Sequence, residues 1–591
     1  MKRYIKSISM LTSLIVISLL LSCSDEEGSS GLNVKPYFGV IERYACDINN
    51  PPKYGEAPCD IDSFRLCAYS EKLNSIICNE YSVDEGKSGA QLKLPEAEDF
   101  RIFFQGFNKE KPDLMLWCGA TDRISLKKGE KKDISVFIGR CSDFVFTRNK
   151  MNSKRAFHTS TLLKDGRVLI AGGISSVSSN SCDPNCDGRN CKPYCRIAEA
   201  ISDVEIYDFR TGEFKKVGKL NIPRALHTAT LLEDGRVIIA GGSKSVRLYL
   251  TPDKNKPFVM PDSMDEASIT IEVFDPTTNS FKKIQSEVSR AMHTAYLAPS
   301  GKIYAFGGIS NNSGDFESRI AEIDPSRGFV DTKISLTIGR IMPSIVDFST
   351  VDSTSTAAAL VGGAVIDEEN DKGNSFDIIS FADATPSVKE HRYSVKDGYI
   401  LSSFGLNALP VDNGKFLLCG GLFMKDIKIG FAGSDIEVVA NNPLDYAYYF
   451  DINNNNVSNP ERNNNMLSRR VLYQMIYMHS KNPRILITGG FEAANPEYAS
   501  DDSFLPYVPG RDVELFLVHS ELFDSIHPAG IVNPANPVVR MNEARAGHTI
   551  QMLPDQTILV VGGFSSPNTI SDTAEVFQPY STDKDVSLLV Y

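Results

Sequence analysis

Residues 155–173 read "RAFHTSTLLKDGRVLIAGG", and the rhythm of polar and apolar positions changes along this stretch. The first half alternates, which predicts a strand with one buried face, whereas the continuously apolar run before the glycines predicts a strand buried on both faces. Asp165-Gly166 between them is typical of a tight hairpin turn. A third strand is expected at 204–208 ("VEIYD") and a fourth around Phe214. The pattern therefore predicts a four-stranded antiparallel sheet.

The same unit recurs along the chain. Four copies keep the spacing from Arg through His to Gly-Gly, and three degenerate copies keep the apolar strand and its terminal glycines. The full copies occupy residues 155–173, 224–242, 290–308 and 545–563, and the others end at Gly362-Gly363, Gly420-Gly421 and Gly489-Gly490. The later third strands are expected at 271–275, 321–324, 448–451, 521–524 and 574–577. Self-similarity at a fixed period predicts a repeat architecture in which neighbouring units stack.

These motifs resemble the kelch repeat, which has Gly-Gly after an apolar strand, an aromatic residue before Asp, and an aromatic residue in the last strand. Kelch repeats usually carry Trp in that last place, where this chain has Phe214, Phe281 and Phe329. The resemblance covers about residues 144–591 and implies a β-propeller like the central domain of galactose oxidase, with seven blades for seven Gly-Gly units. A ring must close, and either 143–148 or 585–591 could supply the last strand.

Recurrence also guides the interpretation of the residues that could carry chemistry. A catalytic residue is needed once, whereas a framework residue is needed in every unit. We therefore expect structural roles, spread around the ring, for the repeated residues His158, His227, His293, His548, Arg155, Arg224, Arg290 and Arg545. The remaining histidines show no ligand spacing, and no nucleophile elbow, phosphate loop or dinucleotide fingerprint is present. No catalytic residue, cofactor or metal site is expected.

Residues 34–142 lack the repeat. Short alternating runs such as "SFRLCAYS" (63–70) are separated by turn residues, and no long helical period is present. This part is expected to be a small β-sandwich stapled by disulfides, loosely similar to immunoglobulin-like modules, with the role of a spacer. The expected fold is thus all-β: a seven-bladed kelch-type β-propeller over 143–591, preceded by a disulfide-stapled sandwich.

The first 23 residues predict export and lipidation. A basic start precedes the apolar run 10–21, which is too short to span a bilayer comfortably, and Ser22 precedes Cys23. This resembles a bacterial lipobox, which implies a signal peptide over 1–22, lipid on Cys23 and an acidic linker over 23–33. An ordinary cleaved signal peptide is the alternative. The expected location is the bacterial outer membrane, facing the periplasm or the cell surface, with the lipid as the only membrane contact.

Ten of the twelve cysteines are expected to form disulfides, because export brings the chain into an oxidising compartment. They fall in two even groups: Cys46, Cys59, Cys67, Cys78, Cys118 and Cys141, then Cys182, Cys186, Cys191 and Cys195. The second group overlaps half of a calcium-loop pattern, and four cysteines also suit zinc, so a metal stays open for that loop. Cys419 lies in an apolar strand and is expected to be buried and free.

Long inserts follow Gly-Gly at 174–201, 243–269, 422–446 and 491–512. Strands of a blade alternate in direction, so all four inserts should rise from one face as loops without regular structure, and such loops are usually functional. The last insert contains the exposed-face candidates Tyr498, Phe504, Tyr507 and Arg511, which could contact a sugar or a protein.

The net charge of −12 argues against a nucleic-acid partner, which would need a basic face. The expected function is a monomeric, non-catalytic binding protein that presents the insert face to a protein or glycan ligand. The alternative is an enzyme of oxidase, epimerase or lyase type that acts on a sugar or polysaccharide in the propeller channel.

Overall fold

The computed structural model describes residues 30–40, 58–86, 89–178, 196–249, 258–310, 316–365, 375–383, 385–392, 403–412, 414–428, 437–443, 447–454, 456–458, 470–478, 484–492, 508–517, 540–566 and 568–579. Within these residues the protein is all-β, and its α-helical content is one four-residue helix, α1 (Val83–Gly86). No described helix is both long and apolar enough to cross a bilayer. The chain divides into an N-terminal unit, mainly 52–138, and a C-terminal unit, mainly 139–581.

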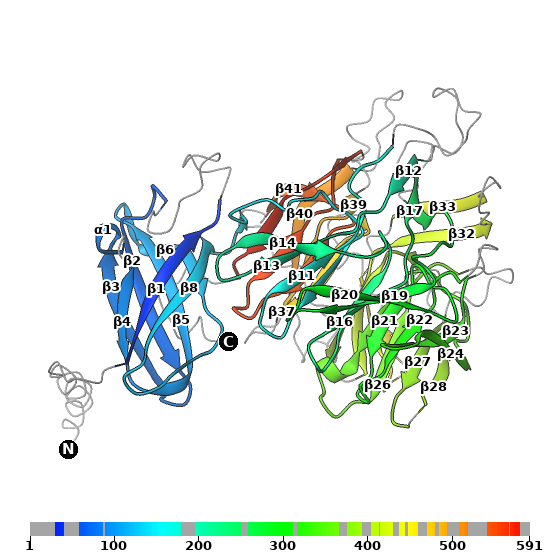
Figure 1. Ribbon diagram of the computed structural model, residues 1–591, viewed down its shortest axis with the longest axis horizontal. Helices are drawn as coiled ribbons and strands as arrows, with labels where there is room; N and C mark the ends of the chain where they lie inside the picture. The colour runs from blue at the N-terminus through cyan, green and yellow to red at the C-terminus, as the bar shows by residue number, and fades with distance from the viewer. Residues whose placement is uncertain are drawn as a thin grey trace, which may run out of the picture. The chain divides into compact units, whose positions relative to one another are not determined.

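Eight strands of the N-terminal unit join in one hydrogen-bonded path, β3-β2-β5-β6-β8-β1-β4, with β7 on β5 (Figure 1). The strands are β1 (Ser30–Phe38), β2 (Ser63–Ser70), β3 (Ser75–Ser82), β4 (Ala90–Leu94), β5 (Ala97–Asn108), β6 (Lys111–Ala120), β7 (Ile124–Leu126) and β8 (Lys131–Arg140). β2 with β3, β2 with β5, β5 with β6 and β1 with β4 are antiparallel pairs, whereas β1 and β8 are parallel. The N-terminal domain was expected to begin at residue 34 after a linker over 23–33, whereas β1 begins at Ser30.

The core of this unit forms around Trp117, the single tryptophan of the chain. Its ring lies edge-on to Phe38 at 6.0 Å, and its indole N–H donates to the Asp60 carboxylate at 2.8 Å. A disulfide joins Cys67 and Cys78, which face each other across β2 and β3. Further disulfide-bonded cysteines are Cys59, Cys118 and Cys141. The prediction of a stapled N-terminal unit is confirmed for these five cysteines, while Cys46 and the group 182–195 lie outside the described residues.

The C-terminal unit contains a series of four-stranded antiparallel sheets, each in the order of the chain. The first four are β10 (Thr159–Leu162), β11 (Val168–Ala171), β13 (Asp203–Asp208) and β14 (Glu213–Lys219); β15 (Thr228–Leu231), β16 (Val237–Ala240), β19 (Thr270–Asp275) and β20 (Ser280–Gln285); β21 (Thr294–Leu297), β22 (Ile303–Phe306), β23 (Arg319–Asp324) and β24 (Gly328–Ser335); and β25 (Ser344–Asp347), β26 (Ala357–Val361), β27 (Ser375–Ser380) and β28 (Ser387–Arg392). The second strand of each is almost wholly buried, as its continuous apolar run predicts.

The fifth sheet follows the same plan, and the sixth is larger. The fifth consists of β30 (Asn407–Asp412), β31 (Lys415–Cys419), β34 (Ala447–Asp451) and β35 (Asn456–Ser458), and the sixth of β36 (Arg470–Val471), β37 (Gln474–Met478), β38 (Arg484–Thr488), β39 (Phe491–Glu492), β40 (Val508–Leu517) and β41 (Arg540–Arg545). In the sixth sheet β38 pairs with residues 513–517 of β40, so the expected third strand at 521–524 is wrong. Cys419 is buried and is not part of a disulfide, as predicted.

The seventh sheet joins the two ends of the C-terminal unit. It consists of β42 (Thr549–Met552), β43 (Ile558–Val561), β46 (Ala574–Phe577) and β9 (Phe144–Phe146), and β9 pairs with β46. The segment 143–148 therefore supplies the fourth strand, and 585–591 lies outside the described residues. Phe144 packs on Phe577 at 4.9 Å, as Phe214 packs on Tyr207 and Phe281 on Phe274 at the same separation.

Backbone hydrogen bonds link every repeat to the next. The second glycine of each Gly-Gly pair donates to the carbonyl of the residue at the Arg position of the following repeat, and Gly563 of the last repeat donates to Arg155 of the first. The donors are Gly173, Gly242, Gly308, Gly363, Gly421, Gly490 and Gly563, and the acceptors are Arg224, Arg290, Arg340, Ser403, Arg470, Arg545 and Arg155. The first glycine allows this approach, since a Cβ on Gly241 would lie 2.3 Å from the Arg290 carbonyl oxygen.

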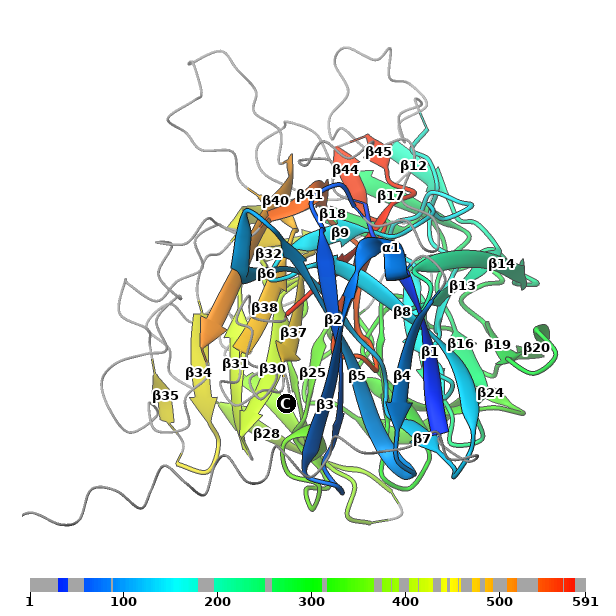
Figure 2. The ribbon, with the colours of Figure 1, turned by 90° about the vertical axis from the view of Figure 1, so that its left-hand side faces the viewer.

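Several inserts form strands of their own, which corrects the expectation of loops without regular structure. β12 (Arg196–Glu199) and β17 (Ser245–Tyr249) come from successive inserts and pair with each other, and β18 (Phe258–Pro261) pairs with β17. The other added strands are β29 (Ser403–Phe404), β32 (Leu422–Lys428), β33 (Glu437–Pro443), β44 (Phe564–Ser566) and β45 (Thr569–Ile570). In Figure 2, β12, β17, β18, β44 and β45 gather at one end of the C-terminal unit.

Candidate functional site

The repeated arginines lie inside the C-terminal unit and hold backbone groups of their own repeat. Arg155, Arg224, Arg340, Arg470 and Arg545 are fully buried. Each donates from Nη1 to the carbonyl of the first glycine of its Gly-Gly pair at 2.8–3.0 Å. Such a buried guanidinium satisfies carbonyl groups that would otherwise lose their hydrogen bonds to water.

A glutamate on the third strand neutralises three of these arginines. Glu205, Glu272 and Glu575 are fully buried and accept from Nη2 of Arg155, Arg224 and Arg545 at 2.7, 3.0 and 3.0 Å, respectively. Burial lowers the pKa of Arg224, and the charge of Glu272 opposes that shift. The pair is therefore a desolvated ion pair that depends on both partners.

An asparagine three residues before the arginine completes the motif. Asn152, Asn221 and Asn542 each donate from the backbone N–H and from Nδ2 to the second carboxylate oxygen of the glutamate. Our reading of the sequence missed this Asn-Arg-Glu set, although the printed repeats contain its signal: Asn recurs at Arg minus three, and Glu recurs second in "VEIYD", "IEVFD" and "AEVF".

The fourth repeat keeps its arginine, Arg340, but changes the acid, and the fifth repeat loses both. In the fourth repeat the shorter Asp377 replaces Glu, and Thr337 replaces Asn and donates its hydroxyl to Asp377 at 2.5 Å. Burial raises the pKa of Asp377, while Thr337 and Arg340 oppose that shift. In the fifth repeat Ser403 takes the Arg position and Tyr448 the Glu position, so neither charge is present.

The repeated histidines connect neighbouring repeats. The Nε2 atom of His227 contacts the Thr159 hydroxyl at 3.1 Å, and His293 contacts Thr228 at 2.9 Å. His548 contacts Thr488 and His158 contacts Thr549, each at 2.9 Å, so the last contact joins repeats seven and one. Burial lowers the pKa of His227, His293 and His548 to about 3, so these rings are neutral at physiological pH.

The described residues contain no group of three His, Cys, Asp or Glu side chains that could hold a metal ion. Of the four histidines outside the repeat positions, His391 stacks on Phe376 with ring centroids 5.7 Å apart. His479, His519 and His527 lie outside the described residues, as does the cysteine-rich loop 182–195 with its half calcium-loop pattern. Metal binding by that loop therefore stays a possibility raised by the sequence alone.

The residue two positions after each arginine has a left-handed backbone in all seven repeats. These residues are Phe157, Leu226, Met292, Met342, Gly405, Leu472 and Gly547, with φ between 49° and 64°. Their backbones form a relay in which Leu226 donates to Phe157, Met292 to Leu226, Met342 to Met292, and Phe157 to Gly547. Two further backbone hydrogen bonds, from Gly547 to Leu472 and from Leu472 to Gly405, continue the relay.

The side chains of this relay are part of an apolar cluster that insert strands also enter. Phe157, Leu226, Met292 and Leu472 are buried, and Met342 packs against them. The same cluster contains Ala198 of β12, Val246 and Leu248 of β17, Val259 and Met260 of β18, and Ile570 of β45. The inserts therefore pack onto the relay, so its apolar side chains contact protein instead of water.

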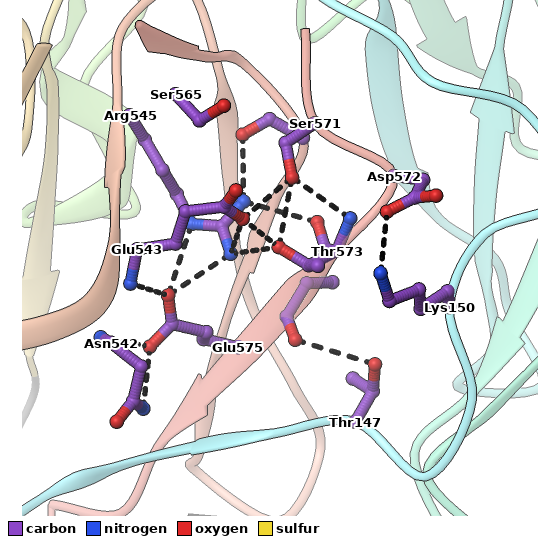
Figure 3. A network of polar contacts seen from close by, with 12 residues as sticks. Thr147, Lys150, Asn542, Glu543, Arg545, Ser565, Ser571, Asp572, Thr573 and Glu575 are labelled. Atoms are coloured by element: carbon purple, nitrogen blue, oxygen red, sulfur yellow. Dashed lines mark hydrogen bonds and ion pairs between the residues drawn. The ribbon is translucent and has the colours of Figure 1, made fainter. Parts of the chain in front are cut away.

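A pocket of about 440 Å³ lies where the chain leaves β9, beside β41 and β46. It is lined by Val40, Phe146, Thr147, Arg148, Asn149, Lys150, Asn542, Glu543, Thr573 and Ala574. Figure 3 shows the carboxylate of Glu543 turned toward Ser571 and Thr573, with Glu575 and Asn542 on one side and the Lys150–Asp572 pair on the other. This pocket combines charged, amide and aromatic groups within the size range of about 300–1,000 Å³ that small-molecule sites occupy.

None of the predicted ligand-face side chains can be placed. Tyr498, Phe504 and Tyr507 lie outside the described residues, and for Arg511 the description reaches only the backbone, in β40. We call the pocket defined above the seam pocket. The sequence analysis did not predict it. Its residues come from segments separated by almost the whole C-terminal unit, so no local motif marks it.

Comparison with known proteins found similar solved structures but no similar sequence. The structure is similar to a copper-bound fungal alcohol oxidase of the AA5 family, with 14% identity, coverage of 73% of this chain and 75% of the oxidase, and a TM-score of 0.45. It is also similar to YjhT, with 14% identity, coverage of 65% of this chain and 99% of YjhT, and a TM-score of 0.38. No family model and no curated protein matches the sequence.

Proposed function

We propose that the C-terminal unit is a seven-bladed kelch-type β-propeller and that the protein is a lipid-anchored binding protein of the bacterial cell envelope. Its insert face would present a rigid surface to a glycan or protein ligand, and the N-terminal unit would act as a spacer. The closed cycle of Gly-Gly hydrogen bonds and the pairing of β9 with β46 support the propeller. The lipobox-like sequence ending at Cys23 supports the anchor.

The apolar cluster over the left-handed relay carries the functional proposal. Residues at the start of the first strand of each blade surround the axis of a propeller, so the cluster would fill the channel mouth on the insert face. An enzyme in the channel needs polar groups and room for substrate there. Phe157, Leu226, Met292 and Leu472 are apolar and buried, so they supply neither. Ligand binding by the part of the insert face away from the propeller axis is therefore more consistent with these side chains than catalysis in the channel.

The most informative experiment combines binding and turnover. Soluble protein beginning at residue 24 would be applied to a printed glycan array, and the sugars that bind would be incubated with the protein and analysed for products. Binding without turnover is the expected result. Product formation from a bound sugar, or one copper ion per chain in the protein purified from cells, would overturn the proposal in favour of the enzyme.

The anchor is tested separately in cells. Metabolic labelling with an alkyne fatty acid should mark the full-length protein, and Cys23→Ser should abolish the label. The matched control is Cys419→Ser, because this buried thiol belongs to the repeat unit and should leave labelling intact. Equal labelling of the Cys23→Ser protein would contradict the lipid anchor.

A further inference from the structure

The seam pocket lies at a repeat that keeps the Asn-Arg-Glu motif and adds a second acid to it. The residue two positions before the arginine is Ser153 in the first repeat and Ile222 in the second, but Glu543 in the seventh. Arg545 thus faces two carboxylates, Glu575 at 3.0 Å and Glu543 at 3.5 Å. Other repeats place a second acid elsewhere: Arg290 pairs with Glu317 at 3.4 Å, and Asp203 accepts the Ser153 hydroxyl at 2.6 Å. Glu543 is the only charged residue that the seven repeats have two positions before the arginine position. A residue needed for the fold recurs in every repeat, whereas a residue needed for function occurs once. Glu543 therefore has the pattern expected of a functional residue.

Only half of the Glu543 carboxylate is used by the protein. Its Oε2 accepts the Ser571 hydroxyl at 2.6 Å and also the Thr573 hydroxyl. The other oxygen, Oε1, has no hydrogen-bond partner among the described residues, and the side chain is 27% exposed. Glu543 is one of the residues that line the seam pocket, and a carboxylate oxygen is a strong acceptor for a donor from a ligand.

The remaining lining supplies groups of complementary kinds. Lys150 reaches the pocket with a side chain 68% exposed and pairs with Asp572 at 3.2 Å, and Arg148 pairs with Glu213 at 3.4 Å. Phe146 is half-buried at the end of β9 and adds an aromatic surface. Cationic donors, an anionic acceptor and an aromatic ring therefore line one cavity.

We propose that the seam pocket binds an uncharged sugar residue of a glycan, whose hydroxyl groups donate to Glu543 Oε1 and accept from Lys150. The lining carries both signs of charge, so it disfavours a strongly anionic or cationic ligand as a whole. A hydroxyl group donates and accepts, so a polyhydroxylated ring satisfies both kinds of side chain, and its apolar face can pack on Phe146. This inference rests on the proposed function, since it names the glycan among the ligands of the insert face.

The test compares three variants of the soluble protein on a printed array of neutral, acidic and amino sugars, followed by calorimetric titration of the best binder. Glu543→Gln keeps the shape and removes the charge, and Lys150→Gln changes an exposed side chain that does not support the fold. Glu322→Gln is the matched control, because Glu322 is 26% exposed and also pairs with a cation, Lys302, but lies in the third repeat.

The wild type should bind a neutral glycan. Glu543→Gln should weaken that binding by about ten- to a hundredfold and Lys150→Gln by about tenfold, since hydrogen bonds to charged groups contribute about that much. Glu322→Gln should bind like the wild type. Thermal melting shows whether Glu543→Gln folds, and Lys150→Gln still tests the pocket if it does not.

Two results would overturn the inference and separate it from the proposed function. If the wild type binds a glycan and neither pocket variant weakens binding, the ligand lies elsewhere on the insert face and the binding function stands. If the wild type binds only amines, only anionic sugars or no glycan, the assignment of a neutral sugar is wrong. Absence of any glycan or protein ligand would remove the proposed function as well.

Discussion

Substitution of Arg224 by Met should destabilise the second repeat by about 3–5 kcal/mol. The guanidinium donates to the carbonyls of Gly241, Ala267 and Thr270 at 2.8, 3.2 and 3.1 Å and to Glu272 at 3.0 Å. Both charged side chains are 0% exposed. Removal of one partner leaves a buried, uncompensated carboxylate, and the stated cost is the one such losses typically show.

Two further variants separate this ion pair from a simple change in size. Arg236→Met removes an exposed arginine whose partner Asp234 lies at 2.6 Å, and it should cost less than about 1 kcal/mol. The double variant Arg224→Met with Glu272→Gln should be more stable than Arg224→Met alone, because the buried charge is gone while an oxygen remains for the Ile222 N–H. The coupling should be about 0.5–3 kcal/mol.

Hydrogen exchange followed by mass spectrometry measures the effect, because peptides of β15, β16 and β19 report the second sheet directly. Fluorescence of Trp117 in urea provides an internal control, since this single tryptophan belongs to the N-terminal unit and its transition should not move. If Arg224→Met costs no more than Arg236→Met, or if the double variant is less stable than Arg224→Met, the interpretation of the buried pair is wrong.

Three other predictions follow from the described contacts. The pKa of His293 is lowered from 6.5 to about 3 in the folded protein, so between these pH values the unfolded chain binds one proton more than the folded chain. The free energy of unfolding should therefore fall as the pH drops from 6.5 toward 3, by about 1.4 kcal/mol per pH unit for this group. His293→Asn should make that dependence shallower in urea titrations at several pH values. Gly547→Ala should cost about 1–3 kcal/mol, because φ is +60° and the new Cβ would lie 2.8 Å from the Phe157 ring. Replacement of both Cys67 and Cys78 by Ala should lower the stability of the N-terminal unit by about 2–4 kcal/mol, read from Trp117 fluorescence, since it removes a crosslink across 11 residues.

Each of these predictions has its own contradicting result. An unchanged pH slope in His293→Asn would mean that the ring is not held neutral by the fold. The control for Gly547 is Gly301→Ala, where φ is +81° but nothing lies within 4 Å of the added carbon, so equal costs would exclude the Phe157 clash. An unchanged urea midpoint after loss of the Cys67–Cys78 bridge would show that this disulfide does not support the unit.

Much of the strand order could be predicted from local pattern, because each repeat carries the same alternation, turn and glycines. The third strand of the sixth repeat shows the limit. Residues 513–517 ("VELFL") and 521–524 ("ELFD") have the same rhythm, and only the pairing of Val513 with Thr488 distinguishes them. Pairing is a long-range property that periodicity does not contain.

The candidate site was harder to predict than the fold. Recurrence was enough to interpret the arginines and histidines as framework residues, and the same comparison could have found Asn542 and Glu575. Glu543 carries no signal on its own, since a single acidic residue in a short strand such as β41 is ordinary. Its pocket exists because β9 returns to β46, which brings residues 146–150 beside residues 542–574.

The pairing of β9 with β46 has a consequence for synthesis. The hydrogen bonds from Thr147 to Ala574 span 427 residues, so the earliest part of the repeat unit to be made must wait for nearly the last. Until then β9 has no β46 to pair with and presents unpaired backbone groups, which invites wrong partners. A nonsense mutation near the end of the coding sequence would therefore harm the whole unit, instead of trimming a single sheet from it.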